Sequence, residues 1–297
     1  MHNDFISIAL TTIYTMFVMV FIAPDVLWPY VGGITILVVG LAMLFKHFRH
    51  RLGEIRSWGP LFYAIPLAVF GAQHFTATRF VAQGVPQWMP WHVFWIYLVG
   101  IALFAAALSL VTGVQTKLAA PLLGVMLLSF VFLLHIPNYI SSPHDRVRFA
   151  VLLRDLAFSG GAFALAAKLW DSHKLAIVAR FFVAVPLIVF GGLNILHPEL
   201  VPAVPLVKLT PLWIPLHLLW DYLTGVIFII AALCLFAKFQ AKRAATWTGG
   251  WVFLMILLIY LPITIASPAD IANAVNYFAD TLMFSGTLLL LADAMNN

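Results

Sequence analysis

Long apolar stretches alternate with short polar or proline-containing breaks along almost the whole chain. An α-helix needs about 20 apolar residues to cross a bilayer, and stretches of about that length recur throughout the sequence. The pattern predicts an all-α integral membrane protein with about ten transmembrane helices. We expect these helices over residues 5–22, 26–45, 58–79, 91–112, 118–140, 147–168, 175–196, 212–237, 247–266 and 271–292.

The composition supports this interpretation. Of the 297 residues, 63% are hydrophobic and only 9% are charged, and the mean hydropathy is +1.02. These values lie far outside the range of soluble globular domains. The opening MHNDF has no positive region, and no small-residue cleavage site precedes PDVLWPY. We therefore expect the first apolar stretch to stay in the mature protein as a membrane helix.

The placement of the basic residues that give the net charge of +5 indicates how the helices are oriented in the membrane, rather than a nucleic-acid partner. The basic residues are spread among short connections, and with ten helices most of them fall on one side of the membrane. Connections rich in Lys and Arg usually face the cytoplasm. Both termini are therefore predicted to be cytoplasmic, and no nucleic-acid binding is expected.

Landmark residues of one half of the chain return in the same order in the other half. WMPWHVFWIYLVG at 88–100 matches WIPLHLLWDYLTG at 213–225 at its Trp, Pro, His and Gly positions. Two further matches are IPLAVFGAQHF with VPLIVFGGLNI and HIPNYISSPHD with YLPITIASPAD. Such ordered matches indicate a tandem duplication.

The duplication predicts three regions. Residues 1–50 form an N-terminal helix pair, and residues 56–170 and 175–293 form two four-helix-bundle repeats. Because each repeat has an even number of spans, the two should be parallel, related by an axis along the membrane normal.

The second repeat carries RFFVAVPLIVFGGLNILHPEL, then LLWDYLTGVIFIIAALCLF, and later FADTLMFSGTLLLLAD. An Arg-led first helix with a Gly pair, a second helix with a central Gly and a closing Gly-containing helix resemble the DoxX family of membrane proteins. The resemblance covers residues 180–292 well and 56–168 less closely. It implies a bacterial or archaeal cytoplasmic-membrane protein built from a four-helix bundle, in a family linked in some members to quinone-coupled sulfur oxidation.

An up-down-up-down bundle brings several histidines to the outer membrane face. In the first repeat these are His74, His92, His135 and His144. The second repeat holds His217 at that level, with Asn194 and Tyr260 in the places of His74 and His135. Neutral imidazole binds a transition metal or haem iron, bonds to a quinone carbonyl, or moves a proton near neutral pH. Simple interfacial histidines also fit the sequence, which leaves these chemistries open.

The repeated aromatic motif suggests a local geometry for these histidines. With Pro90 in the first helical turn, a continuous helix would place Trp88, His92 and Trp95 on one face. In the second copy Asp221 follows His217 by four residues, within reach of a His–Asp pair. The tryptophans also fit a role as anchors at the bilayer interface.

Charged residues occur inside the apolar layer. Arg154 and Asp155 follow Arg148 by about 10 Å along the helix axis, and Asp280 lies at nearly the same place in the second repeat. Charges at this depth usually face a bundle interior or a wet cavity. Two interpretations stay open, namely a charge-handling or proton-handling site, or a salt bridge that joins the two copies.

Three functions remain open. The leading one is a DoxX-like protein whose outward-facing pocket binds quinone, haem or a metal and works with a periplasmic redox partner; as an enzyme it would be an oxidoreductase or a membrane subunit of one. The others are a non-enzymatic carrier or permease and an assembly subunit of a membrane complex. The lone Cys234 allows no disulfide, CxxC pair or thiolate cage within the chain. No nucleophile elbow, phosphate loop or HExxH motif is present, which disfavours hydrolases and kinases.

Overall fold

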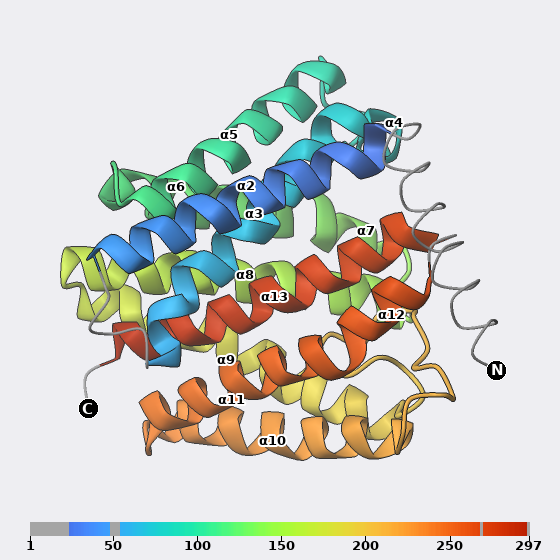
Figure 1. Cartoon of the computed structure of the whole chain (residues 1–297). Coiled ribbons are helices and arrows are strands. Elements are labelled where there is room, and N and C mark those ends of the chain that lie inside the picture. The colour runs from blue at the N-terminus through green and yellow to red at the C-terminus, as the bar shows by residue number, and fades with distance from the viewer. Residues whose placement is uncertain (1–23, 48–53, 268–269, 296–297) are drawn as a thin grey trace, which may run out of the picture.

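The computed structural model describes residues 24–47, 54–267 and 270–295 (Figure 1). Throughout these residues the regular structure is helical, which confirms the all-α prediction. The β pairing found within them is an isolated antiparallel bridge between Leu200 and Leu209.

Seven helical segments of the described residues are long and apolar enough to cross a membrane. They are α5 (His92–Thr112), α6 to α7 (Thr116–Ile140), α8 (Arg146–Trp170), α9 (His173–Leu196), α10 (His217–Ala237), α11 to α12 (Ala241–Ala266) and α13 (Ile271–Ala294). The length and composition of these helices are those of a multi-pass membrane protein. Of the ten expected spans, the described residues support seven. The expected span 5–22 lies outside the described residues.

Two further helices correspond to expected spans without reaching the same length of apolar sequence. In α2 (Pro24–His47), residues Val31–Ala42 form a shorter apolar stretch. The apolar sequence of the helix α3 (Gly59–Thr76) is interrupted by the polar residues Gln73 and His74. This helix is flanked by the short helices η2 (Ile55–Trp58) and α4 (Thr78–Ala82). Because α3 is buried between neighbouring helices, it needs little lipid-facing apolar surface.

The helices α8 and α13 form the centre of the molecule. In the most apolar 18-residue stretch of each span, 72% of α8 and 83% of α13 are buried, compared with 28–39% in the other spans. We call α3 to α8 the first half and α9 to α13 the second half. The first helix of each half packs on the last helix of the other: α3 on α13, and α9 on α8. The two halves are therefore joined by contacts between the first helix of each and the last helix of the other.

Glycines at these crossings allow the contacts between the halves. A Cβ on Gly286 of α13 would lie 2.6 Å from the backbone nitrogen of Tyr63 in α3. At the matching place in α8, a Cβ on Gly160 would lie 2.9 Å from Cβ of Phe182 in α9. Small residues at helix crossings bring backbones close together in membrane proteins. Both inter-half crossings therefore depend on a glycine.

Two spans contain a π-helical turn. The turn η3 (Val131–His135) lies between α6 (Thr116–Phe130) and α7 (Ile136–Ile140), and η4 (Ile256–Tyr260) lies between α11 (Ala241–Met255) and α12 (Leu261–Ala266). The second residue after each turn is a proline, Pro137 or Pro262. Proline lacks an N–H and crowds the carbonyl four residues earlier, and a wider π turn accommodates that mismatch. His135 and Tyr260 each end one of these turns.

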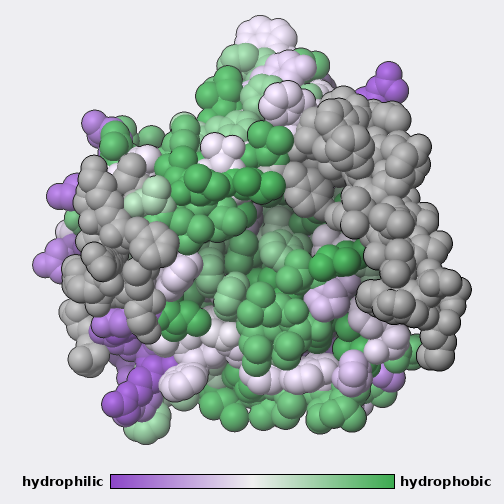
Figure 2. All heavy atoms as spheres, viewed as in Figure 1, coloured by the Kyte–Doolittle hydropathy of each residue, from purple (hydrophilic) through white to green (hydrophobic). Residues whose placement is uncertain are grey.

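The antiparallel helices run between two ends (Figure 1). We call the histidine end the one formed by the starts of α5, α8, α10 and α13, and the lysine end the opposite one. Figure 2 shows apolar side chains over most of one face and hydrophilic ones along its left edge, the side on which α13 ends in Figure 1. The cytoplasmic location of the lysine end stays a prediction, and the N-terminus lies outside the described residues.

Candidate functional site

A buried pair of side chains joins η3 to α8. Nε2 of His135 lies 2.7 Å from Oδ2 of Asp155. The side chains are 17% and 8% exposed, so the pair is largely shielded without being sealed. Here the π turn places His135 opposite α8, and the preceding α6 packs along that helix. The sequence named both residues as candidates but did not predict that they pair.

The same aspartate connects to an ion pair between the two central helices. Nε of Arg154 donates to Oδ1 of Asp155 over 2.9 Å, and Nη1 of Arg154 donates to Oδ2 of Asp280 over 2.8 Å. The latter contact joins α8 to α13, so the salt bridge expected as one interpretation is present. The four residues form a continuous chain that we call the His–Asp–Arg–Asp network.

The ionised groups of the network do not balance one another while its histidine is neutral. Two carboxylates face one guanidinium, which leaves one negative charge in excess while His135 is neutral. Uncompensated charge inside an apolar layer is strongly unfavourable. One proton bound within the network would remove this excess, so the network as a whole can hold and release one proton.

One atom of the network stays open to a further partner. Within the described residues, Nε2 of His135 pairs with Asp155, whereas its Nδ1 makes no hydrogen bond. Nδ1 is therefore the place where a ligand oxygen or a water molecule can exchange a proton with the network.

The other histidines that the sequence named as candidates in the first half lie at the same end but do not join this network. Nδ1 of His74 pairs with the carbonyl of Phe70 over 2.8 Å, and Nε2 of His92 pairs with the carbonyl of Pro86 over 3.0 Å. His144 is exposed in the loop before α8. Among the described residues, no three His, Cys, Asp or Glu side chains are grouped as metal ligands. The expected convergence therefore brings the histidines to one end without forming a shared ligand set.

The expected geometry of the aromatic motif is wrong in one respect. The helix α5 begins at His92, because Trp91 adopts a left-handed conformation with φ 56° and stops the helix there. Trp88 and Pro90 therefore precede the helix, and Trp88 shares no helical face with His92 and Trp95. Trp95 instead donates from Nε1 to the carbonyl of Pro90 over 3.0 Å.

Trp88 and the neighbouring Trp91 are 68% and 77% exposed, as expected for interfacial anchors. The start of α5 also lines a shallow depression with Trp91, His92, Val93 and Phe94. In this depression a histidine lies among exposed aromatic side chains.

Two other expected roles are not seen. His217 and Asp221 do not form the expected pair, because both carboxylate oxygens of Asp221 are buried and without a hydrogen-bond partner in the described structure. Arg148 lies outside the network and holds the turn before α8, donating to the carbonyl of Asn138 over 2.9 Å and to Oγ of Ser141 over 2.8 Å.

Sequence reasoning did not predict the buried loop between α9 and α10. Residues 201–206 are all buried. Nη1 and Nη2 of Arg146 donate to the carbonyls of Pro205 and Leu206, each over 2.6 Å, and the hydroxyl of Tyr260 donates to the carbonyl of Pro202 over 2.5 Å. The sequence did carry a signal for this loop, namely ELVPAVPLVKL, an apolar segment with two prolines between two expected spans. We call residues 198–210 the plug.

Within the described residues, the two halves differ at the histidine end because only the second contains a plug of this kind. Asn194, which holds the plug at Ala203, is 0% exposed, and Tyr260 is 2% exposed. Their sequence counterparts His74 and His135 stay partly exposed, and none of the described side chains of residues 77–91 is buried. Figure 2 shows a hollow near the middle of one face, between α3 and α13.

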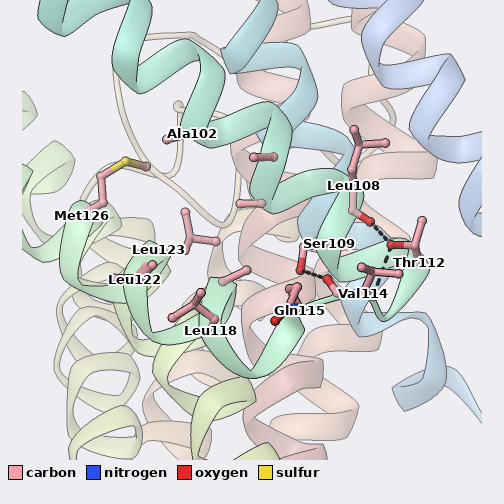
Figure 3. Close-up of a pocket in the computed structure, with 13 residues that line it drawn as sticks. Ala102, Leu108, Ser109, Thr112, Val114, Gln115, Leu118, Leu122, Leu123 and Met126 are labelled. Atoms are coloured by element: carbon pink, nitrogen blue, oxygen red, sulfur yellow. Dashed lines mark hydrogen bonds between the residues drawn. The ribbon is translucent and has the colours of Figure 1, made fainter.

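A separate groove of about 680 Å³ lies between α5 and α6 (Figure 3). Its wall is mostly Ala and Leu side chains, including Ala102, Leu118 and Leu122, with Ser109 and Thr112 toward the lysine end. It contains none of the candidate site residues and is suited to an apolar chain, as expected for a lipid-facing groove.

Comparison with protein-family models, curated proteins and solved structures found no match to this chain. The fold and the spans define its class as an all-helical, multi-pass membrane protein, for which the lipid bilayer is the expected environment.

Proposed function

We propose that the chain is a tandem duplication of a DoxX-like four-helix unit, interlocked through α8 and α13. Matching contacts support this proposal. Oγ of Ser159 donates to the carbonyl of Gly124 and Oγ of Ser285 to that of Gly249, each over 2.8 Å. The two π turns and the exchange of α3 and α9 between halves give further support.

The His–Asp–Arg–Asp network is the proton-exchanging part of a site for a quinone-type ligand in the first half. The observation that carries this proposal is the free Nδ1 of His135 on an imidazole that Asp155 holds from the other side. A quinone takes up two electrons and two protons when it becomes a quinol. His135 donates one proton to a quinone oxygen or accepts one from a quinol, the second proton is exchanged with water, and a redox partner protein exchanges the electrons.

Quinone fits the site better than haem or a metal ion. Metal sites in proteins need several convergent ligands, whereas a quinone carbonyl needs a single donor. The first half offers that donor on a partly exposed histidine with an apolar surround. In this role the protein is a membrane subunit of an oxidoreductase in a cytoplasmic membrane.

The test is the quinone content of protein purified in mild detergent, measured by chromatography of an organic extract. We expect bound quinone in the unaltered chain and about a tenfold loss of affinity in His135→Gln, because a hydrogen bond to a ligand contributes roughly 1.5 kcal/mol. His217→Gln, at the same end of the second half, is the matched control and should retain quinone. Equal retention in both variants, or no quinone in any of them, would contradict the proposal.

A proton-coupled carrier is the second candidate, favoured by the Arg154–Asp280 ion pair between the two central helices. Parallel repeats around a central polar pair suit alternating access. This function predicts substrate-driven proton flux in quinone-free proteoliposomes, lost in Arg154→Gln. Flux that persists without quinone would favour the carrier over the redox site.

A further inference from the structure

A second titratable group lies buried in the other half of the molecule, apart from the His–Asp–Arg–Asp network. Asp221 of α10 is 0% exposed, and neither of its carboxylate oxygens has a hydrogen-bond partner in the described structure. At the matching position the first half has Ile96, which is also buried, at 2%. Asp221 therefore occupies a position between helices that the fold otherwise fills with a hydrocarbon side chain.

The charged groups around Asp221 do not neutralise it. Glu199, near the start of the plug, is the charged neighbour acting on Asp221, and it is itself acidic. Tyr260, at the end of η4, is a neutral neighbour whose hydroxyl is donated to the plug. The cations of this region are engaged elsewhere: Arg146 with two plug carbonyls and Lys208 with Asp270 over 3.1 Å.

A carboxylate with no cation and no donor is far less favourable in an apolar surround than a neutral carboxylic acid. We propose that Asp221 is a proton-binding site, holding a neutral carboxylic acid in the resting protein and exchanging its proton with water at the histidine end when the plug moves. Uptake adds one proton from water to the carboxylate oxygen, and release returns it. This site does not depend on quinone binding in the first half.

The plug lies beside Asp221, because Glu199 of the plug acts on its carboxyl group and Tyr260, a further neighbour of Asp221, donates to Pro202 of the plug. It is fixed by bonds from several elements, among them Arg146 of α8, Asn194 of α9 and Tyr260 of η4. The hydroxyl of Tyr260 is the smallest of these attachments that a substitution can remove, because Tyr260→Phe deletes one oxygen and keeps the ring. Loosening this attachment should expose Asp221 to water more often.

The protonation state can be read directly by infrared spectroscopy of the protein in membranes. We expect the carbonyl stretch of a protonated carboxylic acid, shifted in D2O, in the unaltered chain. The band should disappear in Asp221→Asn, move in Asp221→Glu and persist in Glu199→Gln. Because Asn is an uncharged isostere of the neutral acid, Asp221→Asn should fold as the unaltered chain does.

The rate at which the band shifts in D2O tests the role of the plug. Tyr260→Phe should accelerate that shift severalfold. Tyr63→Phe is the matched control, because the hydroxyl of Tyr63 makes an equally short buried bond to the carbonyl of Phe158, 2.5 Å, remote from the plug. The control should exchange at the unaltered rate.

Three outcomes would overturn the proposal. The first is an infrared spectrum of the unaltered chain without a protonated carboxyl band, and the second is a band that survives in Asp221→Asn. The third is an unfolding temperature that rises with Na⁺ or K⁺ in the unaltered chain but not in Asp221→Asn, which would assign the site to a metal cation. Equal exchange rates in Tyr260→Phe and Tyr63→Phe would overturn the part assigned to the plug.

Discussion

Arg154 is the residue on which the central charges depend. It is the cation that the network provides for two buried carboxylates, one on its own helix and one on α13. Removing a single partner of a buried ion pair leaves an uncompensated charge, which is far more destabilising than never having the pair. The effect of substitution should therefore exceed what a loss of hydrogen bonds alone produces.

We predict that Arg154→Gln lowers the free energy of unfolding by roughly 3–5 kcal/mol, measured by fluorescence-detected unfolding in detergent. The double variant Arg154→Gln with Asp280→Asn should recover part of this loss, because it removes one of the two stranded charges. Lys168→Gln is the control: it breaks a more exposed ion pair with Asp293, 41% and 29% exposed, and should cost about 0–1 kcal/mol. An effect of Arg154→Gln no larger than that of the control would contradict a central role.

The residues of this network were recognisable from the sequence because charge inside an apolar run is conspicuous. Their pairing was not, because the π turn that brings His135 opposite Asp155 depends on how Pro137 is accommodated. Arg146 and Tyr277 gave no signal, since their plug partners are remote in the chain. Side-chain partners across a fold follow from packing that periodicity does not encode.

At the scale of elements, the crossing of α3 and α13 is the tightest test of the interlocked packing. Gly286 lies against the backbone of α3, which cannot move aside as a flexible side chain can. Glycine within a helix is otherwise unfavourable by about 1 kcal/mol relative to alanine. The clash of an added Cβ destabilises the protein, whereas the higher helix propensity of alanine stabilises it. Substitution of one crowded and one uncrowded glycine can therefore separate the two effects.

Gly286→Ala should destabilise the protein by about 1–3 kcal/mol, the usual range for overpacking. Gly192→Ala should be neutral or stabilising, because a Cβ there meets no atom within 4 Å and only the helix propensity changes. Unfolding of both variants in the same detergent gives the comparison. Similar behaviour of the two variants would show that α3 and α13 do not approach as closely as described.

Element positions were largely predictable, but some boundaries were not. The spans from 91 onward correspond to observed helices because each has an apolar run bounded by polar residues or proline. The start of α10 was expected at residue 212 but lies at His217. The start of α5 was predicted to within one residue, but the helix expected to continue through Trp88 and Pro90 is interrupted by the left-handed Trp91. The burial of the plug was not predicted, because it depends on donors supplied by α8, α9 and η4.

At the scale of the whole molecule, the two halves share a framework and differ in what occupies their histidine ends. The second half is filled by its own plug over Asp221, whereas His74 and His135 of the first half remain partly exposed. An exchangeable ligand needs an open site, so the structure favours the first half for binding. The second half provides a shielded carboxyl and a fixed framework.

Both proposed sites lie toward the histidine end, and the side of the membrane that this end faces can be tested. In a Cys234→Ala background, Gln87→Cys places a thiol in an exposed loop of the histidine end, and His173→Cys places one at the exposed start of α9, at the lysine end. The basic connections at the lysine end favour a cytoplasmic location. We expect a membrane-impermeant maleimide to label Gln87→Cys in intact cells and His173→Cys only after permeabilisation.

The unaltered chain is the control, because Cys234 lies within α10 and should react with the impermeant reagent in neither condition. The opposite labelling pattern would turn the histidine end toward the cytoplasm. A redox partner for His135 would then have to be cytoplasmic, and the plug over Asp221 would exchange protons with the cytoplasm instead of the outside. The labelling thus decides from which side of the membrane either proton site is served.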